Sequence, residues 1–218
     1  MKLDFNRYKK GDARKAFIAI HGWGGNKESF LPFVENIKID NVEWFLPEAP
    51  YLINDAPPIS SQNALKNNDC SKKSWTYKRK DGSWEIDEPT KMLNNFFNNL
   101  VFQDYESKNV FIMGFSQGAA ICYEYVLGIE KCLGGVFPIG GFLFKNSSKI
   151  NRVSLQNKKT PIIIGHGNVD KVIPIEKSKT AYKCLLKEKA NVRFVEYNGG
   201  HKISLNFLKE IIRVVDGK

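Results

Sequence analysis

Cysteine is scarce in this sequence of 218 residues, and its four cysteines form no C-x-x-C pair and no dense framework. This spacing argues against a scaffold held together by disulfides. We therefore expect free thiols and a cytoplasmic, reducing location, although the sequence leaves open a disulfide between two of them. The cysteines are Cys70, Cys122, Cys132 and Cys184.

Long apolar runs are also missing. The longest nearly apolar stretch covers residues 134–144 and contains both Gly and Pro, so it is too short and too irregular to span a bilayer. The first ten residues, MKLDFNRYKK, lack the apolar core of a signal peptide. We expect no stable membrane insertion.

Acidic residues are in the minority. Lys and Arg number 33 against 23 for Asp and Glu, a formal net charge of +10. One interpretation is an anionic partner such as a membrane surface or nucleic acid. The other is compositional bias towards Lys and Asn, with the charge serving solubility. The basic residues are scattered, and the densest group, in the loop-like stretch 72–80, is small, so we predict no nucleic-acid partner.

Short apolar runs alternate with amphipathic segments along the chain. The runs are rich in Val, Ile and Phe, which is typical of parallel strands covered on both faces. Alternation of strand and helix predicts an α/β fold with a mostly parallel central sheet flanked by helices. The expected strands are 16–20, 42–46, 110–115, 135–139, 161–164 and 192–197. The expected helices are 89–102, 119–127, 177–189 and 203–215.

Residues 51–88 interrupt this alternation. The stretch is long, polar and rich in Pro, Ser and Asn. Structureless loops of this length are uncommon in compact domains and are often functional lids. Because no second core is visible there, we interpret it as a lid-like insertion in a single domain covering residues 1–218.

The sequence GFSQGAA, residues 114–120, follows the expected strand and precedes an expected helix. A serine between a strand and a helix, with small neighbours, is typical of a nucleophile elbow. Gly114 and Gly118 provide the small neighbours, and the helix N-terminus would stabilise negative charge developing at the site. Ser116 is therefore a candidate nucleophile; an ordinary glycine-bounded turn is the alternative.

A nucleophilic serine needs a histidine base and an acid that orients it. The chain has three histidines, and each lies in a glycine-flanked segment just after an apolar strand: His21, His166 and His201. Ligands of open α/β sheets bind beyond the carboxyl ends of the strands. We expect all three to lie at the same edge as Ser116; as an alternative, each could be a turn residue whose ring binds the backbone.

In hydrolases with such an elbow the triad follows the order Ser, then Asp or Glu, then His along the chain. This order selects His201 as the base. Asp170 is the best candidate for the acid because it follows the strand 161–164, although it could instead be a turn or cap residue. The other carboxylates of this interval fall within or at the ends of helix or strand patterns: Glu130, Glu176, Glu188 and Glu196.

Two backbone N–H groups are predicted to form the oxyanion hole. The first belongs to Gln117, directly after the nucleophile, and the second to Trp23 in the segment HGWGG, residues 21–25. The glycines allow the backbone to approach a substrate carbonyl closely. His21 and His166 are expected to orient loops rather than transfer protons.

Together, GFSQGAA, HGWGGN, the aspartate of GHGNVDKVIP and the histidine of NGGHKIS resemble the phospholipase/carboxylesterase family of α/β-hydrolases, which includes the acyl-protein thioesterases. The resemblance covers residues 15–215. It implies an α/β-hydrolase fold with a triad of Ser116, Asp170 and His201, without metal or organic cofactor. It also implies hydrolysis of esters or thioesters through an acyl-enzyme.

Tryptophans mark two departures from the family pattern. The family usually carries a short aliphatic residue where this chain has Trp23. The stretch 74–77 resembles a family segment near the acyl pocket, but a basic stretch with Trp84 follows it. Trp23, Trp75 and Trp84 are candidate substrate-binding residues, with core or lid packing as the alternative.

We therefore predict a carboxylesterase acting on small to medium acyl groups, with a small-molecule ester or thioester as substrate. Lysophospholipase or acyl-thioesterase activity is the alternative within the hydrolases, and peptidase activity stays open. A non-catalytic binder of anionic surfaces is the alternative from another class. A homodimer that covers the acyl site is compatible with the sequence.

Overall fold

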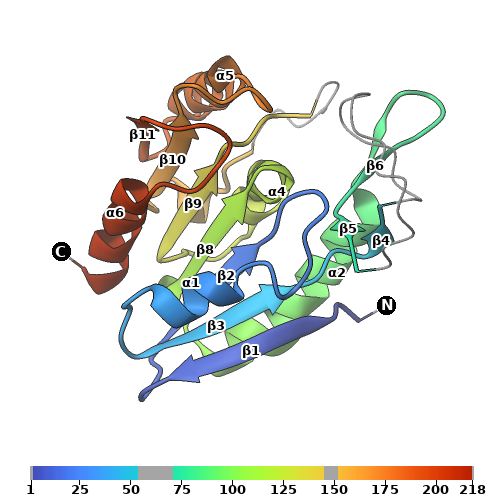
Figure 1. Cartoon of the computed structure of the whole chain (residues 1–218). Helices are drawn as coiled ribbons and strands as arrows, with labels where there is room; N and C mark the ends of the chain where they lie inside the picture. Colours follow the sequence, from blue (N-terminus) through green and yellow to red (C-terminus); the bar gives the residue numbers. More distant parts are fainter. Residues whose placement is uncertain (1, 54–70, 145–151, 218) are drawn as a thin grey trace.

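The computed structural model describes residues 2–53, 71–144 and 152–217. Its centre is a seven-stranded sheet with the order β1-β3-β2-β8-β9-β10-β11 (Figure 1). β1 pairs antiparallel with β3, and all other pairs in this sheet are parallel. The mostly parallel sheet confirms the predicted fold class. The strands are β1 Phe5–Lys10, β2 Lys15–Ile20, β3 Val42–Pro47, β8 Val110–Phe115, β9 Gly135–Ile139, β10 Ile162–Gly167 and β11 Val192–Tyr197.

Helices cover both faces of the sheet because the inner strands are apolar on both sides. Along β2, Ala16, Ile18 and Ile20 enter the core beneath α2 and α5, whereas Phe17 and Ala19 enter the core beneath α1 and α6. Each large apolar side chain buried in this way contributes about 1.5–3 kcal/mol. The helices are α1 Leu31–Asn36, α2 Asp87–Phe96, α3 Phe102–Asp104, α4 Gln117–Glu124, α5 Ile175–Lys187 and α6 Leu205–Asp216.

The segment predicted as one helix over 89–102 is helical but irregular. α2 passes into a π-helical turn, Phe97–Val101, before α3. Phe97 and Val101 are buried in the core, so the wider turn keeps the apolar stripe on the sheet. Across the described residues, no helix combines the length and apolar character needed to cross a membrane.

The insertion contains short strands in its described part. β4, Tyr51–Leu52, pairs with β5, Lys73–Ser74, and β6, Tyr77–Lys78, pairs with β7, Trp84–Glu85. Figure 1 places these pairs beside the carboxyl ends of the central strands. Residues 54–70 of the predicted lid lie outside the described residues, as does Cys70.

Candidate active site

Ser116 occupies the tight junction between β8 and α4. Its φ of 55° is unusual for a residue other than glycine. A Cβ atom on Gly114 would lie 2.4 Å from the carbonyl oxygen of Gly118, and one on Gly118 would lie 2.1 Å from that of Ile20. The Ser116 N–H group donates to the Ile139 carbonyl on β9 at 2.8 Å. Two glycines and a neighbouring strand therefore hold the serine in this conformation.

Ser116, His201 and Asp170 form one hydrogen-bonded chain. Nε2 of His201 lies 3.0 Å from Oγ of Ser116, and Nδ1 of His201 lies 2.7 Å from Oδ2 of Asp170. Because a carboxylate only accepts, Nδ1 carries the proton and Nε2 can accept from the serine hydroxyl. The three residues follow β8, β11 and β10, so the structure brings them together from three separate strand ends.

Asp170 is fixed by the loop that carries it. Its Oδ1 atom accepts hydrogen bonds from the N–H groups of Val172 and Ile173, both at 2.9 Å. Burial alone would raise the pKa of Asp170, but the Ile173 N–H group, the His201 ring and the Val172 N–H group together lower this pKa below its usual value. The carboxylate therefore stays ionised at neutral pH.

His166 is fully buried and also approaches Asp170. Its Nε2 atom lies 2.8 Å from the Ile173 carbonyl oxygen and 3.3 Å from Oδ2 of Asp170. Its Nδ1 atom lies 2.7 Å from Oγ of Ser178, which donates to the Gly141 carbonyl at 2.8 Å. His166 thus orients the loop that carries the acid.

His21 is also buried, and its ring joins the segment 21–25 to the chain just after β3. Nδ1 lies 2.7 Å from the Gly22 carbonyl oxygen, and Nε2 accepts the Ala49 N–H group at 3.1 Å. Burial lowers the pKa of His21 to about 4, although the Gly22 carbonyl acts in the opposite direction. The ring is therefore neutral at pH 7 and orients its loop, as the sequence suggested.

Two backbone N–H groups beside Ser116 are available. In the described part of the chain, neither the N–H of Trp23 nor that of Gln117 has a hydrogen-bond partner. Gln117 begins α4, so its N–H group is one of the free donors of the helix N-terminus. The segment 21–25 is in close contact with the elbow, since a Cβ atom on Gly22 would lie 3.2 Å from Cβ of Ser116.

The three candidate substrate-binding tryptophans lie in different surroundings. Trp75 is fully buried and offers no surface to a substrate in this structure. Trp23 is partly exposed, and its buried Nε1 atom has no hydrogen-bond partner among the described residues. Trp84 is partly exposed and packs against Phe144, with ring centroids 5.2 Å apart, in an apolar cluster that includes Ala120 of α4. Of the three, only Trp23 and Trp84 thus keep part of their surface exposed.

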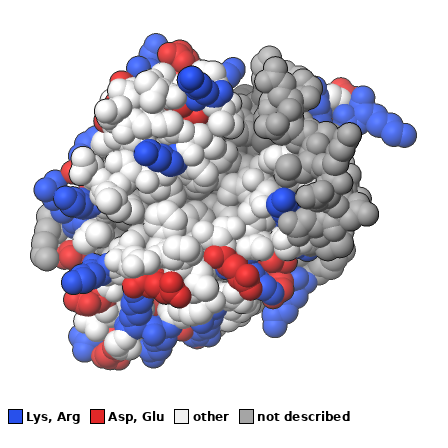
Figure 2. All heavy atoms as spheres, in the orientation of Figure 1, with Lys and Arg blue, Asp and Glu red and all other residues white. Residues whose placement is uncertain are grey.

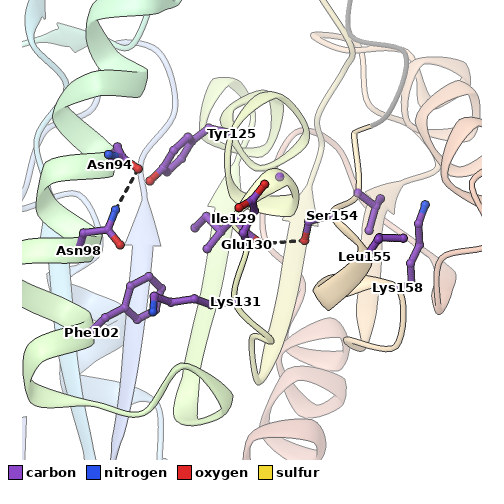
Figure 3. Close-up of a pocket in the computed structure, with 12 residues that line it drawn as sticks. Asn94, Asn98, Phe102, Tyr125, Ile129, Glu130, Lys131, Ser154, Leu155 and Lys158 are labelled. Carbon is purple, nitrogen blue, oxygen red and sulfur yellow. Dashed lines mark hydrogen bonds between the residues drawn. The ribbon is translucent and has the colours of Figure 1, made fainter.

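A groove of about 830 Å³ lies away from these residues (Figure 3). The loops that line it precede β9 and β10, so it lies at the amino-terminal edge of the strands, opposite Ser116. Two of its polar groups bind within the protein: Asn98 donates to Asn94 at 3.0 Å, and Ser154 donates to the Ile129 carbonyl at 2.7 Å. We assign it no part in the chemistry. Among the described residues, no three His, Cys, Asp or Glu side chains form a potential metal site.

Comparison with known proteins identifies the family of this chain. The family model described as phospholipase/carboxylesterase matches residues 7–216. Carboxylesterase SOBER1 of Arabidopsis thaliana is 30% identical over 212 residues, covering 91% of this chain and 88% of the relative. Acyl-protein thioesterase 1 of Kluyveromyces lactis is 24% identical over 216 residues, covering 94% of this chain and 92% of the relative.

The fold is also that of a solved relative. The crystal structure of Arabidopsis thaliana SOBER1 superposes with a TM-score of 0.76 at 28% identity, covering 94% of this chain and 99% of that one. The central sheet, the elbow and the matched family model are those of an α/β-hydrolase. The chain therefore belongs to the phospholipase/carboxylesterase family of α/β-hydrolases.

Proposed function

We propose that the protein is a carboxylesterase that cleaves esters of small to medium acyl groups through an acyl-enzyme on Ser116. The observation that carries this proposal is the hydrogen-bonded chain from Asp170 through His201 to Ser116 at 2.7 and 3.0 Å. A turn serine would need neither an imidazole on its hydroxyl nor a buried carboxylate behind that imidazole.

Acylation begins when Oγ of Ser116 attacks the ester carbonyl while Nε2 of His201 takes the hydroxyl proton. The new C–O bond produces a tetrahedral oxyanion, which the N–H groups of Trp23 and Gln117 stabilise. Asp170 holds the tautomer of His201 and stabilises the imidazolium. Collapse of the intermediate breaks the bond to the alcohol, which leaves with the proton from Nε2.

Deacylation repeats these steps with water as the nucleophile. His201 removes a proton from water, the hydroxide attacks the acyl carbonyl, and the second oxyanion occupies the same two donors. The bond to Oγ then breaks, and Ser116 recovers its proton from Nε2. The products are one carboxylic acid and one alcohol for each ester consumed, and no cofactor is required for this balance.

The acyl group is expected to lie on the apolar surface beside α4. Trp84, Phe142 and Phe144 form an apolar cluster with Ala120, three residues after Gln117. Trp23 is bulkier than the short aliphatic residue that the family usually carries at this position, which favours small to medium acyl groups over long ones. Relatives named as acyl-protein thioesterases make a thioester the principal alternative substrate.

Labelling with a fluorophosphonate probe tests the proposal directly. We expect the wild-type protein to be labelled at Ser116 and Ser116→Ala to remain unlabelled. His201→Ala and Asp170→Asn should label and hydrolyse p-nitrophenyl acetate at least about 10³-fold more slowly, because serine then lacks a correctly oriented base.

Ser107→Ala is the matched control, because Ser107 lies just before β8 at the opposite edge of the sheet. This variant should label like the wild type. A folded wild-type protein that neither labels nor hydrolyses the acetate ester would refute the assignment of Ser116 as nucleophile.

A further inference from the structure

Residues 73–76, here called the strap, bind the segment 21–25, here called the oxyanion loop. The Gly24 N–H group donates to the Lys73 carbonyl, and the Lys73 N–H group donates to the Gly25 carbonyl, both at 2.9 Å. These bonds lie immediately after Trp23, whose N–H group is the proposed oxyanion donor.

The side chain of Trp75 adds a third bond on the other side of this donor. Its Nε1–H group donates to the His21 carbonyl at 2.9 Å, and the two rings lie with centroids 5.3 Å apart. The strap therefore holds the oxyanion loop both before and after Trp23. Such bonds matter here because Trp23 lies between two glycines, and Gly24 has a φ of 78°.

The strap also binds the nucleophile elbow, through the side chain of Gln117. Oε1 of Gln117 accepts the Trp75 N–H group at 2.8 Å, and Nε2 donates to Oγ of Ser74 at 2.9 Å. Ser74 in turn donates to the Thr76 carbonyl at 2.7 Å. All four residues are at most 1% exposed, so water does not compete for these bonds.

The two proposed oxyanion donors belong to different elements, one to the loop after β2 and the other to the first residue of α4. Neither element alone fixes the distance between them. The strap is bonded to both, by its backbone and by two buried side chains. An oxyanion hole accelerates a reaction only when its donors are preorganised for the transition state.

We propose that Gln117 and Trp75 are positioning residues through which the strap fixes the two N–H donors of the oxyanion hole. This inference rests on the proposed function and goes beyond it, because it gives the insertion a role in transition-state stabilisation rather than only in covering the site. The side chains act through hydrogen bonds to the backbone and do not touch the reacting atoms.

Gln117→Met tests the inference, because it keeps the backbone N–H donor and the length of the side chain but removes the bonds to the strap. We expect kcat for p-nitrophenyl acetate to fall about 10- to 100-fold with KM changed less than about threefold. The affinity for a trifluoromethyl ketone, which forms a tetrahedral adduct with the serine, should fall by a similar factor.

Trp75→Phe removes only the indole N–H group and should lower kcat about three- to tenfold. Trp44→Phe is the matched control, since Trp44 is also fully buried but its Nε1 atom has no hydrogen-bond partner among the described residues. It should keep the wild-type kcat. If Gln117→Met does not fold, Trp75→Phe against Trp44→Phe decides the question.

The outcomes separate the two proposals. Folded variants with wild-type kcat, or with KM raised and kcat unchanged, would overturn the role of the strap while leaving Ser116 labelling intact. A wild-type protein without labelling or hydrolysis would overturn the proposed function, and the catalytic role of the strap with it.

Discussion

His21 shows how burial turns a potential proton carrier into a fixed part of the structure. Its pKa is lowered to about 4, first by burial, whereas an unfolded histidine titrates near 6.5. Protonation would also remove the acceptor that Nε2 presents to the Ala49 N–H group. Between these pH values the unfolded chain binds the proton more readily than the folded chain.

The resulting prediction concerns stability against pH. Because folding lowers the pKa of His21, the neutral ring contributes to the free energy of unfolding. This contribution is complete above about pH 6.5, and about 3 kcal/mol of it is lost as the pH falls towards 4. His21→Gln keeps an acceptor for Ala49 but does not titrate. The difference in free energy of unfolding between wild type and His21→Gln, measured with urea, should shrink by about this amount from pH 7 to pH 4. If the free energies of the two proteins change with pH in parallel, the prediction is wrong.

At the same scale, the sequence predicted the residues that come together but not all of their surroundings. Ser116, Asp170 and His201 could be selected because each directly follows an apolar strand, and parallel strands end at one edge. For Trp75 the sequence left substrate binding and core packing open, and the structure buries its indole on the His21 carbonyl. Hydrogen bonds between residues this far apart in sequence leave no local pattern to detect.

At the scale of elements, α4 lies unusually close to β2. A Cβ atom on Gly118 would lie 2.1 Å from the Ile20 carbonyl oxygen and 2.7 Å from that of His21, and both are backbone atoms. A flexible side chain could move away from the added Cβ atom, but the backbone of a central strand cannot. The helix itself would therefore have to shift. The elbow at the start of α4 would move with it.

Gly118→Ala should therefore lower the free energy of unfolding by about 3 kcal/mol, at the upper end for overpacked sites. It should also lower kcat at least about tenfold, because the serine moves relative to its base. Gly200→Ala is the control, since its added Cβ atom would only meet the Val169 carbonyl oxygen at 3.9 Å. Chemical denaturation of both variants provides the measurement, and equal midpoints would contradict the argument.

The strands that the sequence missed share a physical reason. β1 is a half-exposed edge strand with the polar sequence FNRYKK, so no apolar run marks it. The strands of the insertion have two residues each, too few for any periodicity to appear. The six predicted strands are all present. They could be recognised in the sequence because both faces of the inner sheet must be apolar to pack against helices.

At the scale of the whole molecule, the net charge of +10 is spread rather than concentrated. Figure 2 shows basic and acidic side chains mixed around the rim of one face, with few charges in its middle. Several basic groups are paired: Arg79, which follows β6, pairs with Glu85 of β7 and with Asp87 of α2. The face shown in Figure 2 therefore carries no concentrated basic patch for an anionic surface.

The charge should still affect how charged substrates arrive. A net positive protein attracts an anion over a distance set by the Debye length, which is about 30 Å at 0.01 M salt and about 8 Å at 0.15 M. A neutral ester experiences no such attraction. The matched pair p-nitrophenyl butyrate and p-nitrophenyl hemisuccinate has the same leaving group and acyl chains of equal carbon number, but only the second is charged at pH 7.

We expect kcat/KM for the butyrate to change less than about twofold between 0.01 and 0.3 M NaCl, while that for the hemisuccinate falls several-fold. Ser116→Ala provides the background rate for both esters. If the butyrate shows the same salt dependence as the hemisuccinate, salt acts on the folded enzyme rather than on substrate encounter. If neither ester is hydrolysed above background while the protein is retained on anionic vesicles until salt is added, its charge serves binding, and the non-catalytic alternative is correct.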